Sequence, residues 1–499
     1  MKKGTQYTGS VSEVRFPNKG VVEVASEDGT VENCIVKNTL PGQKVKFRVN
    51  KKKNGSCEGL LLEVAQRSPL EIEPVCPHFG LCGGCTYLSL PYPEQLKLKE
   101  EQVRRLMHSV RMPSSAPFRA AGALEKKEEN DPKDGQPEGA SWFEEIWEGI
   151  EPSPLPLEYR NKMEFSFGDL SKGGELELGL HKMGSFYDVL SVPHCRIVDG
   201  DYRSILKETL SFFRGKETPY YHKQTHKGYL RHLLVRKGYK TGEILVDIIT
   251  SSQTPPPTIC TEYGLLEDWR DALLSLKLEG KITGILHTVN DSASDAVKNE
   301  GTELLYGREC FFEELLGLRF RISPFSFFQT NSLAAEVLYK KAGEYIMSTG
   351  MDKKAPVIFD LYSGTGTIAQ MMASAAEKVI GVEIVEEAVL AARENAQANG
   401  LDNCSFIAGD VLKVLDEIDD RPDLIILDPP RDGIHPKAIT KILNYGVSHI
   451  LYISCKPTSL ARDLEIFAAH GYFPERMCSV DNFPASANIE TICLLTSKD

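Results

Sequence analysis

The sequence predicts an α/β protein in which a Rossmann-like parallel sheet follows a small β-barrel and a central α+β domain. Three observations support this prediction. Short strands broken by Gly, Asn and Pro fill residues 1–67, and a strand-rich pattern extends from about 155 to 330. From about 331 onward, short apolar runs alternate with helical segments, as in a parallel sheet with crossover helices. A chain of 499 residues is also too long for one core, and its length suggests about three domains.

The composition is that of an ordinary soluble globular protein, with 41% hydrophobic and 26% charged residues. The N-terminal MKKGTQYTGSV has two lysines but no apolar run after them, which argues against a signal peptide. No stretch approaches the ~20 apolar residues of a membrane helix. We therefore expect a cytoplasmic protein with no membrane partner. Twelve cysteines in that compartment favour metal ligation or catalysis over disulfides.

The first predicted domain, residues 1–67, is a basic barrel. It carries 12 basic and 7 acidic residues, a net charge of +5, whereas the whole chain has a net charge of −12. A basic small barrel is a common platform for nucleic acid. The alternative is a solvated barrel with a lysine-rich hairpin at residues 51–53.

The second predicted domain, residues 68–330, is α+β, with strands such as MEFSFGD, ELELGLH and EILVDIITS. It contains a polar stretch at about 125–151, which includes KKEENDPKDGQPEGAS and has few β-branched residues. Such a composition predicts a flexible acidic insertion.

The third predicted domain, residues 331–499, has the layout typical of class I methyltransferases. The runs VIFDLY, VIGVEI, CSFIAGD, LIILDPP and HILYISC predict five parallel strands. Two more strands close the chain, around YFPERMCSVD and IETICLLTS. The prediction is a seven-stranded sheet whose last strand runs antiparallel to the others.

A glycine turn follows the first strand of this domain. VIFDLY continues into SGTGTIAQ, so Gly364 and Gly366 allow close approach of a ligand to the helix that follows. The second strand ends at Glu383, about 20 residues on, where a carboxylate can accept both ribose hydroxyls. The third glycine of the dinucleotide fingerprint is missing, which favours an adenosyl-methionine site over a dinucleotide site.

Three further side chains are expected at the same edge of the sheet. Asp428 ends the fourth strand in an acidic-Pro-Pro sequence typical of enzymes that methylate bases. Cys455 ends the fifth strand, and Glu490 opens the seventh, which lies beside the fifth in this layout. Free cysteine is often an inert core residue. Here the position at the edge, the carboxylate and Lys456, which can favour thiolate, point to a nucleophile instead.

A thiol and a carboxylate beside a methyl donor suit methylation of an unactivated pyrimidine carbon. Thiolate attack at carbon 6 of uracil makes carbon 5 an enolate carbon able to accept a methyl group. A base must then remove the carbon 5 proton so that the thiol leaves by elimination. Cys455 is the predicted nucleophile, and Glu490 is the predicted base.

Nearly the whole chain resembles the RNA 5-methyluridine (uracil-C5) methyltransferase family. The matching motifs are the FQTN sequence at 328–331, DLYSGTG, DPPRDG, YISC and the DNFP…IE ending. The resemblance implies Cys455 as nucleophile and Glu490 as base. It also implies S-adenosyl-L-methionine as cofactor, with contacts from Gln329, Tyr362, Glu383 and Asp428 and further candidates at Asp410 and Thr367.

The chain departs from the family pattern at three positions. Lys456 stands where the family usually has Asn, and Ala485 and Asn488 stand where it often has His. Both reacting side chains are present, so these departures bear on the RNA target and on loop detail more than on the chemistry.

A cysteine knuckle, Cys76-x5-Cys82-x2-Cys85, places three thiols within ten residues. Cys195, 110 positions further on, is the candidate for a fourth ligand. Spacing alone leaves zinc and an iron–sulfur cluster open. The family resemblance implies a [4Fe-4S] cluster, because many members ligate one with this arrangement. Its expected role is structural or in holding RNA.

RNA is the expected partner. The barrel resembles the TRAM module of RNA-modifying enzymes, and residues 222–240 combine many cations with tyrosines, which suits RNA loops. A strand with a solvated charged face is the alternative for the second stretch. We expect a monomer that acts on ribosomal RNA, with transfer RNA as the alternative.

Three rival functions were weighed. Radical adenosyl-methionine methylthiotransferases also carry a TRAM module but need Cys-x3-Cys-x2-Cys, whereas the first gap here is x5. An adenine N-methyltransferase would have an aromatic residue after the paired prolines, where Arg431 stands. A non-enzymatic RNA-binding or RNA-folding protein would not need both Cys455 and Glu490.

Overall fold

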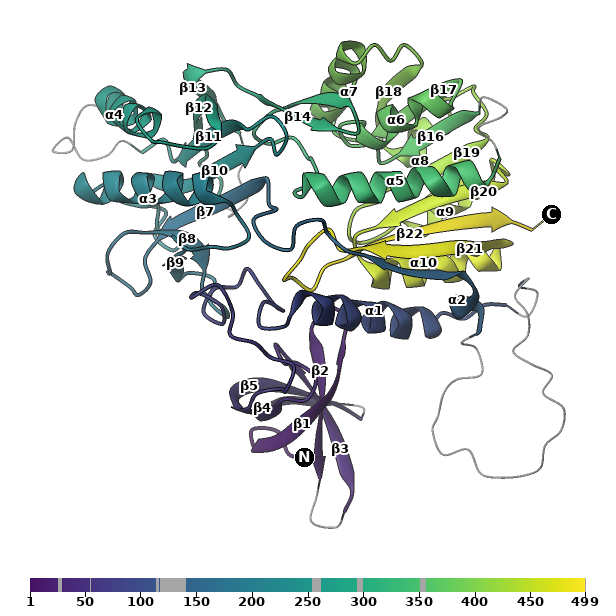
Figure 1. The fold of residues 1–499 in the computed structure, drawn as a ribbon, viewed down its shortest axis with the longest axis horizontal. Helices are drawn as coiled ribbons and strands as arrows, with labels where there is room; N and C mark the ends of the chain where they lie inside the picture. Colours follow the sequence, from purple (N-terminus) through teal and green to yellow (C-terminus); the bar gives the residue numbers. More distant parts are fainter. Residues whose placement is uncertain are drawn as a thin grey trace.

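The computed structural model describes residues 1–25, 29–53, 55–113, 116, 141–253, 262–293, 299–350 and 356–498. Three β-structures dominate it, and helix α1 (Tyr92–His108) runs between the N-terminal barrel and the C-terminal sheet (Figure 1). No helix in these ranges is long and apolar enough to span a membrane.

The predicted barrel is present and closed, with the strand order β1-β2-β3-β5-β4. Burial alternates along β4, where Val45, Phe47 and Val49 are buried between exposed cationic residues. This period of two is that of a strand with one face on a core. The barrel strands are β1 (Gln6–Arg15), β2 (Lys19–Ala25), β3 (Val31–Lys37), β4 (Lys44–Lys53) and β5 (Ser56–Gln66).

The central part is a seven-stranded sheet of order β13-β12-β11-β10-β7-β8-β9. Helices α3 (Gly200–Gly215) and α4 (Glu262–Leu274) pack against each other on it, and a separate hairpin leads toward the C-terminal sheet. The strands are β7 (Lys162–Gly168), β8 (Glu177–His181), β9 (Val189–Ser191), β10 (Leu230–Lys237), β11 (Glu243–Thr250), β12 (Lys281–Val289) and β13 (Thr302–Gly307), and the hairpin is β14 (Phe311–Leu315) with β15 (Leu318–Ile322).

The C-terminal sheet has eight strands in the order β18-β17-β16-β19-β20-β22-β21-β6. The seven predicted strands are all present, and β22 runs antiparallel to β20 and β21. These strands are β16 (Val357–Leu361), β17 (Lys378–Glu383), β18 (Cys404–Ala408), β19 (Leu424–Leu427), β20 (His449–Ser454), β21 (Tyr472–Val480) and β22 (Glu490–Ser497).

Helices cover both faces of this sheet, because its strands are apolar on both sides. One face packs on α5 (Ser332–Ser348), α6 (Thr367–Met372) and α7 (Glu386–Ala398). The other face packs on α1 and on α8 (Val411–Val414), α9 (Pro436–Leu443) and α10 (Pro457–Ala469).

The eighth strand corrects the sequence prediction. Residues 141–151 were expected to belong to a flexible insertion, but they form α2 (Ser141–Ile146) and β6 (Trp147–Glu151). Strand β6 runs parallel to β21, and Trp142 and Phe143 are buried beneath it in the core shared with α1. The signal missed in the sequence was a turn of helix with two adjacent aromatic residues, Trp142 and Phe143, inside a polar segment. Residues 125–140 of the predicted insertion lie outside the described residues.

Candidate active site

Cys455 and Glu490 lie opposite each other at one edge of the C-terminal sheet. Ser454 ends β20 and pairs with Thr491 of antiparallel β22. In this antiparallel register, Cys455, which follows Ser454, lies beside Glu490, which precedes Thr491. The thiol is partly exposed, whereas only 3% of the Glu490 surface is exposed. The edge therefore presents an accessible sulfur backed by a buried carboxyl group.

Buried carboxyl groups surround this pair. Burial raises the pKa of Asp428, just after β19, to about 7. Burial and the neighbouring Asp428 together raise the pKa of Glu490 to about 8. Asp360, inside β16, has its pKa raised to about 8 by burial and by Asp428. Charged carboxylates are therefore disfavoured here unless a cationic partner is present.

The cation beside the thiol is Arg431. Burial and the negative Glu490 and Asp428 raise the pKa of Cys455 to about 11, and Arg431 acts in the opposite direction. The ammonium of Lys456 instead lies 3.8 Å from the carboxylate of Asp432. The expectation that Lys456 favours the thiolate stays a prediction. Arg431, three positions after Asp428 in the DPPRDG loop, was noticed in the sequence only as a departure from another enzyme class.

The glycine turn and Glu383 meet as expected. The carboxylate of Glu383 accepts hydrogen bonds from the backbone N–H of Gly364 at 3.0 Å and of Val385 at 2.9 Å. The two glycines differ in role. A Cβ at Gly366 would lie 2.5 Å from the ring of Phe406, so this glycine is needed for packing. Gly364 has a φ of +54° and more open surroundings, which leaves its backbone accessible to a ligand.

The other cofactor candidates from the sequence lie around the same strand ends. Tyr362 follows β16 in a left-handed conformation, with a φ of 68°. Thr367 opens α6, and Asp410 caps α8 by accepting from the N–H of Leu412, which already gives Asp410 a structural role. Gln329 is buried and lies further away in sequence, just before α5.

Sequence reasoning missed Asp360 and Asn482. Asp360 was visible as a carboxylate inside the apolar run VIFDLY. Its Oδ2 accepts from the N–H of Ala369 at 3.0 Å, while Oδ1 is buried without a partner. Asn482 donates from Nδ2 to Oε1 of Gln329 at 2.8 Å. It therefore connects a predicted cofactor residue with the loop that leads to Glu490, a contact that no local pattern indicates.

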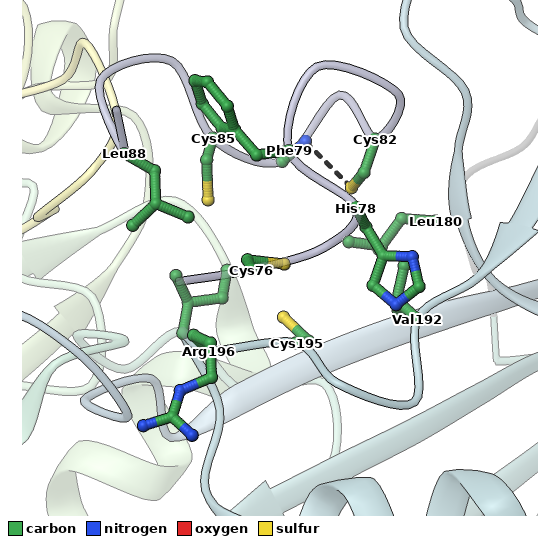
Figure 2. A pocket seen from close by; sticks show the side chains of 12 residues that line it. Cys76, His78, Phe79, Cys82, Cys85, Leu88, Leu180, Val192, Cys195 and Arg196 are labelled. Atoms are coloured by element: carbon green, nitrogen blue, oxygen red, sulfur yellow. Dashed lines mark hydrogen bonds between the residues drawn. The ribbon is translucent and has the colours of Figure 1, made fainter. Parts of the chain in front are cut away.

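The four predicted metal ligands line one small pocket (Figure 2). Cys76, Cys82 and Cys85 come from the knuckle, and Cys195 approaches from the loop before α3. The backbone N–H of Gly84 lies 3.3 Å from Sγ of Cys82. Much of the remaining lining is apolar, including Phe79, Leu88, Leu180, Val192 and Ile197.

Four cysteine thiolates can hold either a zinc ion or an iron–sulfur cluster. Among the described residues, no group of three or more His, Cys, Asp or Glu side chains is arranged to hold a metal ion. A single zinc ion would draw four sulfurs to within about 3.8 Å of each other, given tetrahedral Zn–S bonds of about 2.3 Å. Four thiols in a largely apolar lining, one of them bonded to a backbone N–H, are also compatible with an iron–sulfur group.

A groove of about 1430 Å³ runs between the barrel, the knuckle and helix α1. Its lining includes cationic Arg15, Lys19, Lys37 and Arg105, and it reaches Thr458, three positions after Cys455. The groove therefore extends from the basic barrel to the start of α10, whereas Cys455 and Glu490 are not part of its lining.

The strand within the basic stretch 222–240 is buried. Strand β10 occupies 230–237, and its cations Arg231 and Arg236 are buried. Arg236 donates to the backbone carbonyls of Ser323, Pro324 and Ser326. The predicted RNA-facing role is therefore wrong for this part of the stretch, because its two arginines are buried and bind backbone carbonyls of the protein. Tyr239 is exposed, but Tyr229 is buried.

The chain is similar to known proteins over its full length. A family model described as a methyltransferase domain matches residues 352–489. A Clostridium tetani protein described as an uncharacterized RNA methyltransferase is 42% identical, covering 100% of this chain and 99% of its own. A Caldanaerobacter subterraneus subsp. tengcongensis protein of the same description is 44% identical over 99% of both chains.

A solved structure shares the fold. It is a Pyrococcus abyssi tRNA (uracil-54, C5)-methyltransferase in complex with S-adenosyl-L-homocysteine, with a TM-score of 0.70 and 22% identity over 98% of this chain and 99% of that one. The predicted class I methyltransferase fold, preceded by a barrel and a central α+β part, is confirmed.

Proposed function

The chain belongs to the family of RNA methyltransferases, and from this premise we propose that it makes 5-methyluridine in ribosomal RNA with S-adenosyl-L-methionine as methyl donor. The observation that carries the proposal is the pairing of Cys455 and Glu490 across β20 and β22, beside the buried carboxyl of Asp428. Transfer RNA is the second candidate substrate, because the solved enzyme of the same fold is described as acting on tRNA uracil-54. The proposal includes action as a monomer in the cytoplasm.

The proposed reaction begins with addition of Cys455. The thiol proton passes to solvent, the thiolate Sγ bonds to carbon 6 of the uracil, and the electron pair of the 5,6 double bond moves onto the enolate. Carbon 5 then takes the methyl group from the sulfonium of S-adenosyl-L-methionine, which leaves as the neutral thioether. Glu490 accepts the carbon 5 proton, and the electron pair of that C–H bond re-forms the double bond as the thiolate leaves. Arg431 is suited to stabilise thiolate during addition and elimination.

The charge of the pocket supports S-adenosyl-L-methionine as the methyl donor. Burial raises the pKa values of Asp360, Asp428 and Glu490 into the range of 7 to 8. A sulfonium among these groups favours their ionised forms, and the ionised forms favour the sulfonium. We propose that Glu383, at the carboxyl end of β17, holds the ribose hydroxyls, and that Gln329 and Tyr362 make further contacts.

The RNA is proposed to lie along the groove between barrel and helix α1. Cations of the barrel can pair with phosphates, and an enclosed uridine would be flipped toward Cys455 at a cost of a few kcal/mol. The barrel, residues 1–67, is proposed as a TRAM-like RNA-binding domain. Residues 68–330 and 331–499 are proposed as the central and catalytic domains.

The function is tested by mapping 5-methyluridine. Ribosomal and transfer RNA from a strain lacking the gene are digested and analysed by mass spectrometry, and the same RNA is then treated with the purified protein and S-adenosyl-L-methionine. We expect one ribosomal uridine to lose its methyl group in the strain and to regain it in the treated sample. A methyl group missing from transfer RNA alone would establish the second candidate, and 5-methyluridine unchanged in both RNAs would contradict the proposal.

The cysteine pocket is proposed to hold a [4Fe-4S] cluster through Cys76, Cys82, Cys85 and Cys195. Protein purified without oxygen is expected to contain about four iron atoms per chain and to absorb visible light broadly. A C82S/C85S variant should lose both signals, whereas C310A, which changes a buried cysteine outside the pocket, should keep them. One zinc ion per chain without iron would contradict the cluster and favour the zinc alternative.

A further inference from the structure

The loop of residues 481–489 joins β21 to β22 and ends directly at Glu490. Connecting segments normally lie on the surface. This loop is largely buried: Asp481 and Asn482 are 0% exposed, and Ala485 and Ile489 are 1% exposed. Its course is therefore set by its neighbours, and these neighbours also determine where the carboxyl group of Glu490 lies.

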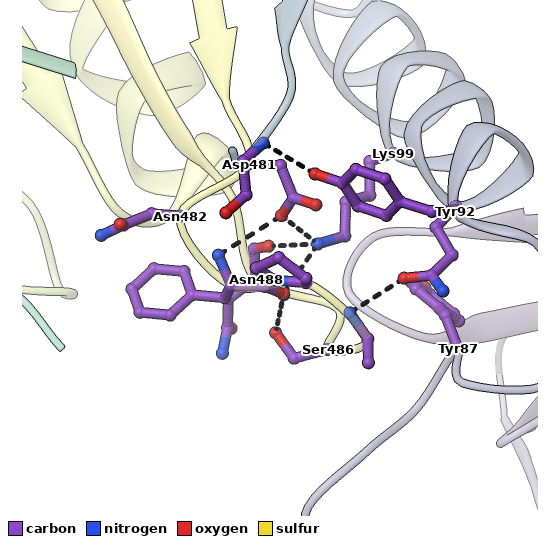
Figure 3. Close-up of polar contacts among 12 residues, drawn as sticks. Tyr87, Tyr92, Lys99, Asp481, Asn482, Ser486 and Asn488 are labelled. Carbon is purple, nitrogen blue, oxygen red and sulfur yellow. Dashed lines mark hydrogen bonds and ion pairs between the residues drawn. The ribbon is translucent and has the colours of Figure 1, made fainter. Parts of the chain in front are cut away.

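Lys99 of helix α1 is the main neighbour (Figure 3). Its side chain is fully buried, and its ammonium donates three hydrogen bonds into the loop. The acceptors are a carboxylate oxygen of Asp481 at 2.6 Å and the backbone carbonyls of Phe483 and Asn488, each at 3.0 Å. An ammonium has three donors, so all of them are used. Lys99 thereby ties the start of the loop to its end, two residues before Glu490.

The same loop is also held by the segment that follows the knuckle and by a second residue of helix α1. The carbonyl of Ala485 accepts from the N–H of Thr86 at 2.7 Å and of Tyr87 at 2.9 Å, directly after Cys85. Its N–H donates to Oε1 of Gln95 at 2.9 Å. Ala485 has a φ of 62°, a strained conformation for a residue with a side chain, which persists because these contacts determine it.

Stabilisation by the ion pair with Asp481 does not by itself account for a lysine at this place. Burying an ion pair in a dry interior gives up hydration of both charges, and replacing such a pair by apolar groups is often neutral or stabilising. By contrast, the hydrogen bonds of Lys99 to two backbone carbonyls fix the path of the chain in the loop. The contacts therefore favour control of loop geometry as the role of this ammonium.

We propose that Lys99 is a positioning residue for the proton-removal step, acting through loop 481–489 on Glu490. The inference rests on the proposed function and deepens it. Adduct formation needs Cys455, which directly follows β20, whereas the three hydrogen bonds of the Lys99 ammonium all go to loop 481–489. Lys99 therefore affects release of the methylated RNA and not formation of the adduct. Misplacement of a catalytic group by about 1 Å lowers a rate by up to about 100-fold.

The test uses K99M and the double variant K99M/D481N. Methionine keeps the length and apolar stem of lysine, and the second change avoids leaving Asp481 buried and unpaired. K97M is the matched control, because Lys97 is on the same helix but 67% exposed and forms a surface ion pair with Glu94. Single-turnover reactions with ribosomal RNA measure the covalent protein–RNA complex on denaturing gels and the released 5-methyluridine.

We expect both Lys99 variants to form the covalent complex within about threefold of the wild-type rate. They should release product about 10- to 100-fold more slowly, and K97M should match the wild type. Release of product by the double variant at the wild-type rate would overturn the inference. Equal losses in the rates of complex formation and product release would also overturn it, because they would indicate general damage to the protein. Absence of any covalent complex in the wild-type protein would instead overturn the proposed function. Thermal unfolding and iron content, measured on each variant, show whether the fold and the knuckle are retained.

Discussion

Replacing Cys455 by alanine is expected to lower the rate of uridine methylation by about four orders of magnitude or more, because carbon 5 of uracil is too weak a nucleophile without addition at carbon 6. The covalent protein–RNA complex should disappear completely. Affinity for S-adenosyl-L-methionine should remain within a few-fold, since the thiol acts on the RNA base. Methyl transfer from labelled cofactor, denaturing gels and calorimetric titration of the cofactor measure these three quantities.

Cys404→Ala is the matched control for this variant. Cys404 is a partly exposed thiol at the start of β18, away from the pair of Cys455 and Glu490. It should keep near wild-type activity and the covalent complex. Uridine methylation by the Cys455→Ala protein at more than a few per cent of the wild-type rate would rule out the covalent mechanism.

Replacing Glu490 by glutamine is expected to trap the reaction after methyl transfer. Glutamine has nearly the shape of glutamate but cannot accept the carbon 5 proton, so the methylated base should stay bonded to Cys455. We expect the covalent complex to accumulate and product release to fall by about 10²- to 10⁴-fold, the usual contribution of a general base. The accumulated complex should carry the labelled methyl group, which distinguishes it from an adduct stalled before methyl transfer.

The pH dependence provides an independent check on Glu490. Its pKa is raised to about 8, mainly by burial, so the carboxyl is mostly protonated at lower pH and cannot take a proton. Release from the wild-type protein should therefore fall as the pH is lowered through this pKa, by about tenfold per unit in the limit. Glu490→Gln should lack that inflection, and an unchanged profile in this variant would assign the base elsewhere.

The positions of Cys455 and Glu490 were predictable because strand topology alone brings them together. HILYISC and the IETICLLTS run are recognisable as strands, and the antiparallel last strand lies beside the fifth. Asp428 and Glu383 follow from the same rule, since each ends a parallel strand at the ligand-binding edge. Short sequence patterns were sufficient to predict the position of a side chain wherever it lies at the end of a strand next to another recognisable strand.

Long-range contacts were not predictable in this way. Lys99 looks in KLKEEQVRR like any solvated lysine on an amphipathic helix, yet it bonds to Asp481, 382 residues away. Arg231 and Arg236 appear to be surface cations, because nothing local shows that β10 is buried. The knuckle cysteines were identified by spacing, but their approach to Cys195 depends on how two segments far apart in sequence pack together.

Strand β6 has a consequence for how the chain is assembled during synthesis. Trp147 pairs with Met477, 330 residues further on, and Glu148 forms an ion pair with Arg476 at 2.6 Å. At the usual 5–20 residues per second, β6 emerges roughly 15 to 65 s before its partner strand is made. During that interval a strand and the aromatic helix before it depend on the rest of the chain or on chaperones to stay unaggregated.

Excision of residues 331–499 would likewise leave β21 with an open edge, the kind of edge through which sheets join each other. The part of the chain that carries the chemistry is thus not a detachable module, and it is completed only when the last strands close on a segment made near the beginning.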